Sequence, residues 1–165
     1  MNQRLSTVDA QWSDWMREKD SLWKCPTDRV LIGREHRGDE NGKTRYRYAR
    51  LVLGEGKDAV TATVIPGEWS SPIRESGSRF VAEDDHVLIG REHQGDESGV
   101  TRYLVGTVAV NDQMVSFTDT GWSESMSESE SQLVARDGEV MIGRAHSGDE
   151  NGATQHQNAA PHLPD

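Results

Sequence analysis

The sequence predicts an all-β protein in which one unit occurs three times around a pseudo-threefold axis, and its internal repeats support this most directly. The stretch VLIGREHRGDENGKT at 30–44 returns as VLIGREHQGDESGVT at 87–101 and as VMIGRAHSGDENGAT at 140–154. The first two copies agree at 12 of 15 positions, and the first and third agree at 11. Identity at this level over fixed spacing indicates an internal repeat, which decides the fold class before any other feature.

The repeat extends beyond this stretch and divides one domain into three units. A Trp-Ser pair stands 18 residues before each copy, at Trp12, Trp69 and Trp122. A glutamate follows six residues after each Trp: Glu18, Glu75 and Glu128. We assign the units to 12–68, 69–121 and 122–165. The third unit ends soon after its repeated stretch, so we expect residues 1–11 to complete it and to remove a raw sheet edge.

Each unit is expected to hold about four strands. Residues 30–36 alternate in character, so Val30, Ile32, Arg34 and His36 share one face of the first strand. The segment RGDENG at 37–42 predicts a tight turn, and 43–51 alternates again as a half-buried second strand. A further strand at 59–65 ends at a Pro-Gly pair. The segment after each Trp is expected to be a loop.

Three four-stranded sheets around one axis would make a β-prism-like fold. The alternative is a β-trefoil, whose three repeats have a similar size. We favour the β-prism because the dominant signature is one hairpin per unit.

Composition limits both the fold and the partners. Only 33% of the 165 residues are apolar and 6% are aromatic, so we expect shallow sheets with wet outer faces. The net charge of −10 argues against nucleic acid. No apolar run approaches the ~20 residues that span a bilayer, and no basic-then-apolar leader opens the chain, so membrane insertion and a signal peptide are not expected. Cys25 is the only cysteine, which excludes an intrachain disulfide.

Every hairpin carries Arg, His, Asp, Glu and Thr at the same spacing, with a Tyr in two copies. Such polar groups beside an aromatic ring suit the hydroxyls and the apolar face of a sugar. Three weak sites on one rigid body would gain avidity on a multivalent surface. The predicted ligand-binding residues are Arg34, His36, Asp39, Glu40, Thr44, Tyr46, Arg91, His93, Asp96, Glu97, Thr101, Tyr103, Arg144, His146, Asp149, Glu150 and Thr154. His156 stands where Tyr46 stands in the first unit, so weaker binding is expected there.

Two other interpretations of the repeated residues stay open. In a structural one, the Asp residues cap turn amides and the Arg residues pair with carboxylates to fix the hairpin. In a metal-binding one, the acidic turns hold Ca²⁺, or one His from each repeat converges on the axis and holds Zn²⁺. We expect no cofactor. We also expect no enzyme activity, because the adjacent carboxylates Asp39 and Glu40 are poorly placed to flank a bond as acid and base.

The segment CPTDRVLIGREHRGDENGKTRYRYA resembles the dermatopontin repeat. In that family an apolar strand leads through a polar loop into a motif of Asp-Arg-x-Trp type. Thr44-Arg45-Tyr46 and Thr101-Arg102-Tyr103 stand in its place here, and Thr154-Gln155-His156 departs further. The resemblance covers about a third of the chain, and the family is rich in disulfides whereas this chain has one cysteine. It implies a threefold fold and a role in extracellular adhesion or sugar binding.

We therefore expect a non-enzymatic, lectin-like protein that binds glycans or a cell surface through three repeated hairpin loops. The alternative is a structural or assembly protein of a larger particle, in which the loops serve only the fold. The expected partner is carbohydrate or a cell-surface glycan, and formation of a homo-oligomer is left open. This function favours a secreted or surface location, although a cytoplasmic one also fits the sequence.

Overall fold

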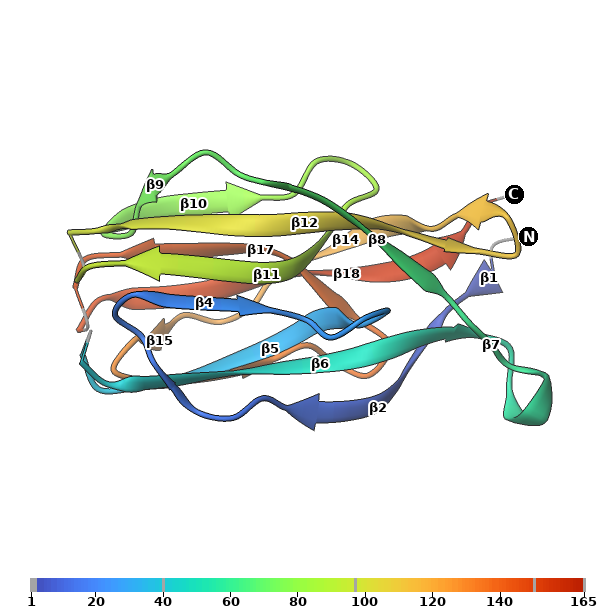
Figure 1. Cartoon of the computed structure of the whole chain (residues 1–165), viewed down its shortest axis with the longest axis horizontal. Coiled ribbons are helices and arrows are strands. Elements are labelled where there is room, and N and C mark those ends of the chain that lie inside the picture. Colours follow the sequence, from blue (N-terminus) through green and yellow to red (C-terminus); the bar gives the residue numbers. More distant parts are fainter. Residues whose placement is uncertain (1–2, 40, 97, 150, 165) are drawn as a thin grey trace.

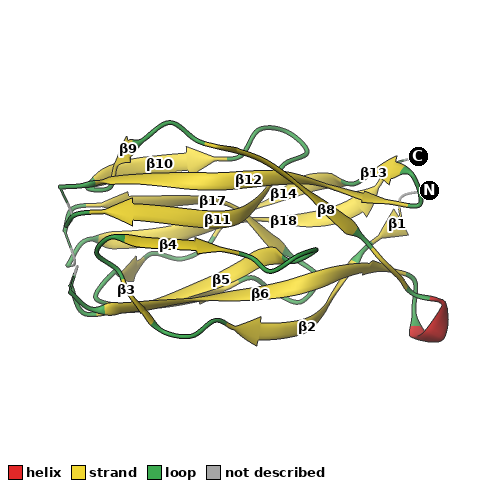
Figure 2. Ribbon diagram, viewed as in Figure 1, coloured by secondary structure: helices red, strands yellow, loops and turns green. Residues whose placement is uncertain are grey.

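The computed structural model describes residues 3–39, 41–96, 98–149 and 151–164. It confirms the all-β, pseudo-threefold architecture: three similar antiparallel sheets, each of six strands, stand around a common axis. The longer strands run along the long axis of the molecule (Figures 1 and 2). Within the described ranges the only helical segment is the 3₁₀ turn η1 (Gly56–Asp58), and no helix there is long and apolar enough to cross a membrane.

The strands repeat in the same order in each unit. The strand that ends at each repeated Trp pairs with the hairpin that follows it, so the structural units begin six residues before the bounds expected from the sequence. The first unit contains β2 (Ser6–Trp12), β3 (Met16–Arg17), β4 (Ser21–Lys24), β5 (Val30–Arg37), β6 (Lys43–Leu53) and β7 (Val60–Thr61). The second contains β8 (Thr63–Trp69), β9 (Ile73–Arg74), β10 (Gly77–Val81), β11 (Val87–Gln94), β12 (Val100–Val110) and β13 (Gln113–Met114). The third contains β14 (Ser116–Trp122), β15 (Met126–Ser127), β16 (Glu130–Val134), β17 (Val140–Ser147) and β18 (Ala153–Leu163). The segment after each Trp, expected to be a loop, includes the two-residue strands β3, β9 and β15.

Each sheet is built on one repeated hairpin and borrows a strand from another unit. In the first sheet β5 and β6 form the hairpin, β2 pairs with the outer side of β6, and β16 of the third unit pairs with β5. In the same way β4 of the first unit pairs with β11, and β10 of the second pairs with β17. These exchanges run around the ring without a break, so no unit has a complete sheet by itself.

The chain termini lie together at one end of the molecule (Figure 1). There β1 (Gln3–Arg4) pairs with β18, in the place that β7 and β13 hold on β6 and β12. Residues 6–12 belong instead to the first sheet as β2. The first unit is four residues longer than the second because six residues join β6 to β7 whereas two join β12 to β13.

The core lies between the three sheets. Its larger apolar cluster includes Val30 and Ile32 with their counterparts from the other units. The strands β5, β11 and β17 contact one another, so they are the innermost strands. Gly33 allows the borrowed strand to come close, since a Cβ there would lie 2.9 Å from the backbone oxygen of Leu133. The register of the β5–β6 pair shifts between Leu31 and Gly33, at a bulge.

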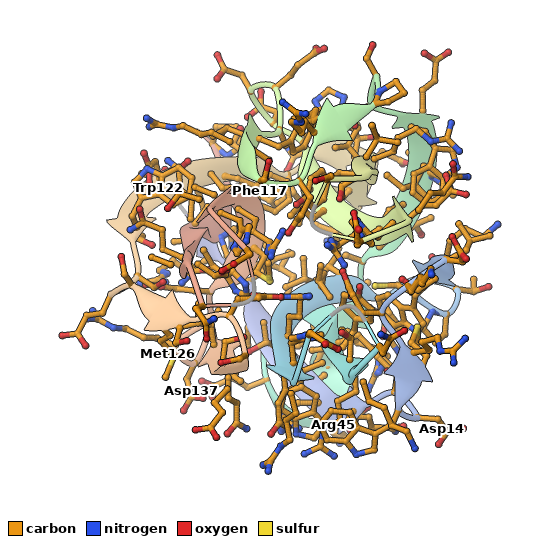
Figure 3. All side chains as sticks on the ribbon, turned by 90° about the vertical axis from the view of Figure 1, so that its left-hand side faces the viewer. Asp14, Arg45, Phe117, Trp122, Met126 and Asp137 are labelled. Carbon is orange, nitrogen blue, oxygen red and sulfur yellow. The ribbon has the colours of Figure 1, made fainter. Side chains whose placement is uncertain are left out.

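The three hairpin tips lie at the end of the molecule opposite the termini (Figure 1, left). Figure 3 looks onto this end and shows the space between the sheets filled with side chains. Whether a predicted site residue can reach a ligand therefore depends on whether its side chain points into this space or toward solvent.

Candidate functional site

A ring of six buried, alternating charges surrounds the pseudo-threefold axis. Its members are Arg34, Arg91 and Arg144 from the hairpins and Glu18, Glu75 and Glu128 from the segments after the repeated Trp residues. The arginines are at most 2% exposed and the glutamates at most 6%. Equal numbers of the two charges make the ring neutral, which is the condition under which charges can be buried at a tolerable cost.

Every arginine in the ring joins two glutamates. Arg34 donates to both oxygens of Glu128, at 3.1 and 2.8 Å, and to Glu18 at 3.3 Å. The short contacts of the other two arginines are 2.8 Å for Arg91–Glu18 and 2.9 Å for Arg144–Glu75. In each case the shorter contact crosses between units and the longer one stays within a unit. The ring therefore ties the three units to one another.

The repeated His and Thr residues form the next layer toward the tips. The hydroxyl of Thr44 donates to Glu18 at 2.8 Å, and His36 Nδ1 lies 2.6 Å from the same hydroxyl. His36 Nε2 contacts the backbone oxygen of Gly38 at 2.8 Å, which anchors the start of the turn. The matching pairs are His93 with Thr101 and His146 with Thr154, at 2.8 and 2.7 Å. These six side chains are buried.

Burial and the neighbouring charges act on the protonation of both layers. Burial alone would raise the pKa of Glu75, but Arg144 and Arg91 lower it to about 2. Glu18 and Glu128 likewise have a pKa well below the usual range, because their arginine neighbours outweigh burial. Burial, reinforced by Arg34, lowers the pKa of His36.

The tyrosines predicted to stack on a sugar instead face the ring. Tyr46 is 0% and Tyr103 is 1% exposed. Their hydroxyls accept hydrogen bonds from Arg91 and Arg144, both at 3.1 Å. Their rings are covered by Trp23 and Phe80, with centroids 4.7 and 4.9 Å apart.

The third unit has a different residue at the position of Tyr46 and Tyr103. His156 replaces the tyrosine, is buried, and leaves its Nδ1 without a hydrogen-bond partner among the described residues. Among the described residues, Arg34 therefore has no tyrosine hydroxyl to which it donates, unlike Arg91 and Arg144.

The aspartates are the described site residues that remain exposed, one on each tip. Asp39 accepts a hydrogen bond from the backbone of Asn41 at 2.8 Å, and Asp96 and Asp149 do the same for Ser98 and Asn151. This is the turn-capping role in which aspartate is common. The same turn requires glycine at position 42, because a Cβ on Gly42 would lie 1.9 Å from the backbone oxygen of Arg37. Glu40, Glu97 and Glu150 lie outside the described residues.

Eleven of the predicted residues are thus brought together, but inside the molecule. They are Arg34, His36, Thr44, Tyr46, Arg91, His93, Thr101, Tyr103, Arg144, His146 and Thr154. The glutamates that pair with them were not among the predicted site residues. Their equal spacing from Trp12, Trp69 and Trp122 was the signal that could have identified them. Among the residues that the structure describes, no group of three or more His, Cys, Asp or Glu is placed to hold a metal ion.

The outer faces of the sheets carry a second repeated feature, which the sequence did not reveal as a unit. A half-buried Trp lies against an arginine in each sheet. The guanidinium carbon is 4.4 Å from the ring centroid for Arg45 on Trp12, and 5.4 Å for Arg102 on Trp69. In the third sheet the arginine comes from the borrowed strand, with Arg79 lying 5.1 Å from Trp122. Figure 3 places Arg45 and Trp122 at the periphery, on different sides of the axis.

The first outer face is the most elaborate. The guanidinium of Arg45 contacts two indole rings, because the ring centroid of Trp15 lies 4.6 Å from it as well. Arg45 and Arg37 both pair with the nearly buried carboxylate of Glu35, at 2.8 and 2.9 Å. This face therefore combines aromatic rings, fixed cations and hydrogen-bonding groups at the surface.

Comparisons with protein-family models, with curated proteins and with solved structures found no match to this chain.

Proposed function

We propose that this protein is a non-enzymatic binding module that recognises glycans or a glycan-bearing surface through the outer faces of its sheets. The observation that carries the proposal is the Trp–arginine pair present on each of the three sheets. This moves the expected sugar contacts from the buried hairpin residues to the periphery of the same molecule.

The chemistry of these pairs fits a sugar. An indole ring packs against the apolar face of a sugar ring, and a guanidinium donates several hydrogen bonds to hydroxyl oxygens. An arginine held against an indole and a carboxylate, as Arg45 is, loses less conformational entropy on binding than a free one would.

The arrangement of the three pairs supports multivalent binding. Because Arg45 and Trp122 lie on different sides of the axis, the outer faces act as separate sites and not as one composite site (Figure 3). The buried charge ring joins the three sheets through contacts between units. Sites fixed on one body gain avidity on a surface with repeated ligands, even where each site is weak.

A glycan array probed with the full chain tests this proposal. We expect binding that weakens when Trp122 is replaced by Leu and is retained when it is replaced by Tyr, which keeps an aromatic ring. Both variants are compared by thermal melting, so that a loss of folding is separated from a loss of binding. The absence of binding to every neutral and acidic glycan on the array would overturn the proposal.

A structural or assembly protein of a larger particle is the second candidate. It is favoured by the burial of the most faithfully repeated polar residues, such as Arg34 and His36, which leaves them to serve the fold. Size-exclusion chromatography with light scattering over a concentration series distinguishes the two. Stable self-assembly without any glycan binding supports this candidate, and a monomer that binds glycans contradicts it.

A further inference from the structure

The first outer face differs from the other two in both charge and shape. Three of its exposed positions hold residues that neither of the other units has. The first unit has Trp15, Arg37 and Lys43 at these positions. The second has Pro72, Gln94 and Val100, and the third has Ser125, Ser147 and Ala153. An indole and two cations have thus been placed on one unit alone, although the protein carries a net charge of −10.

These residues surround one surface depression. It has a volume of about 530 Å³ and is lined by Trp15, Arg37, Asn41, Gly42 and Lys43. Trp15 is 38% exposed, and the side chain of Arg37 is 71% exposed. Arg45 and Arg37 lie over the indole of Trp15, at 4.6 and 6.0 Å from its ring centroid, and the part of the indole that stays exposed offers an apolar surface to a sugar ring.

The local charge of the depression is suited to an anion. The carboxylate of Glu35 is shared by the guanidiniums of Arg37, which lines the depression, and Arg45. Arg37, Arg45 and Lys43 outnumber Glu35 and the exposed Glu130, and both Glu130 and Lys43 are cross-strand neighbours of Arg37. The local balance of these side chains is therefore positive. An anionic ligand is repelled by the protein as a whole and therefore needs such a local excess in order to bind.

We propose that this depression binds a sugar ring that carries a carboxylate or a sulfate group. The ring stacks on Trp15, and the anionic group lies between Arg37 and Lys43, where charge-assisted hydrogen bonds hold it. The inference rests on the proposed glycan-binding function and assigns its ligand class and its principal site. The second and third units, which lack all three residues, bind neutral sugar more weakly and add only avidity.

Matched pairs of glycans, identical except for one carboxylate or sulfate, test the inference on an array. We expect the acidic member of each pair to bind about tenfold more tightly, and its binding to weaken as salt is raised. Equal binding of both members overturns this inference and leaves the proposed function standing. Absence of binding to all glycans overturns both. Separate carboxylated and sulfated sets show which anionic group the site takes.

Variants that introduce residues of the second or third unit locate the site. Arg37→Gln and Lys43→Val are each expected to weaken binding of the acidic glycan about tenfold, and Trp15→Ser to weaken acidic and neutral glycans together. The control is Lys57→Gln, an exposed cation in η1 at the end of the molecule opposite the hairpin tips (Figure 2), which should leave binding unchanged. Melting temperatures of all four should match the parent chain. Unchanged acidic-glycan binding in the first three variants would contradict the assignment of this depression.

Discussion

The inner and outer faces of the three hairpins have diverged to very different extents. On the inner face Arg34, His36 and Thr44 have identical counterparts in both other units. On the outer face the positions of Arg37 and Lys43 read Gln94 and Val100 in the second unit, and Ser147 and Ala153 in the third.

The charge ring explains this difference. Each inner arginine or glutamate contacts two members of the opposite charge, so neutralising one leaves each of those buried partners with a single counter-charge and gives the ring a net charge. An outer residue has solvent on one side, and its replacement costs little. The buried charged residues that are identical in all three units therefore belong to the network that holds the units together. Residues that differ between units lie mainly on the surfaces that each unit presents to solvent.

Breaking the ring should have the largest effect. Glu75→Gln removes a carboxylate that pairs with Arg91 and Arg144, and we expect a loss of about 3–5 kcal/mol in the free energy of unfolding. Urea unfolding measures it, with the exposed Glu68→Gln as the control.

A double-mutant cycle sharpens this prediction. Arg144→Met combined with Glu75→Gln restores neutrality inside the ring, so the double variant should cost less than the sum of the two single variants, by about 1–3 kcal/mol. Additive effects would show that the buried charges act independently and would contradict the ring as a unit.

The second-largest effect is expected from acid, which should destabilise the inner network. The histidines have a pKa below 6.5 in the folded state, so protons bind preferentially to the unfolded chain as the pH falls below that value. The glutamates add a second, larger loss below pH 4.5, on the order of 3 kcal/mol for Glu75 alone, because its folded pKa is about 2. Urea midpoints measured from pH 7 to pH 3 check this. A midpoint that rises between pH 7 and pH 5 would contradict the sign.

The smallest effect is expected where the third unit departs from the inner pattern. His156→Tyr supplies the hydroxyl that Arg91 and Arg144 already receive from Tyr46 and Tyr103. It also removes a buried nitrogen that has no partner among the described residues. We expect a gain of about 1 kcal/mol, and a loss of similar size for Tyr103→Phe. A destabilised His156→Tyr variant would mean that the third corner has closed around the smaller ring.

Much of the fold could be predicted from the sequence because the repeat is nearly free of gaps. The hairpins, their glycine-bearing turns and the threefold symmetry follow from residue spacing alone. The exchange of β4, β10 and β16 between units could not be predicted, because the three sheets present nearly identical pairing partners. Only the three-dimensional path of the connections decides which partner each strand takes.

The site was harder to predict because polar residues were equated with surface. The alternation that puts Arg34 and His36 on the same face as Val30 and Ile32 already indicated burial, since that face is apolar at its start. The evenly spaced glutamates offered the compensating charges. The outer Trp–arginine pairs could not be predicted as a repeated feature, because in the third sheet the arginine belongs to another unit.

The melting temperature of His36→Ala tests most directly the claim that the inner repeated residues serve the fold. His36 is 1% exposed and contacts Thr44 and the backbone of Gly38. Its removal should lower the melting temperature by about 5–10 °C, whereas His86→Ala, outside the repeated pattern, should leave it unchanged. An unaltered melting temperature together with weaker glycan binding would contradict the account and return the ligand site to the hairpin residues.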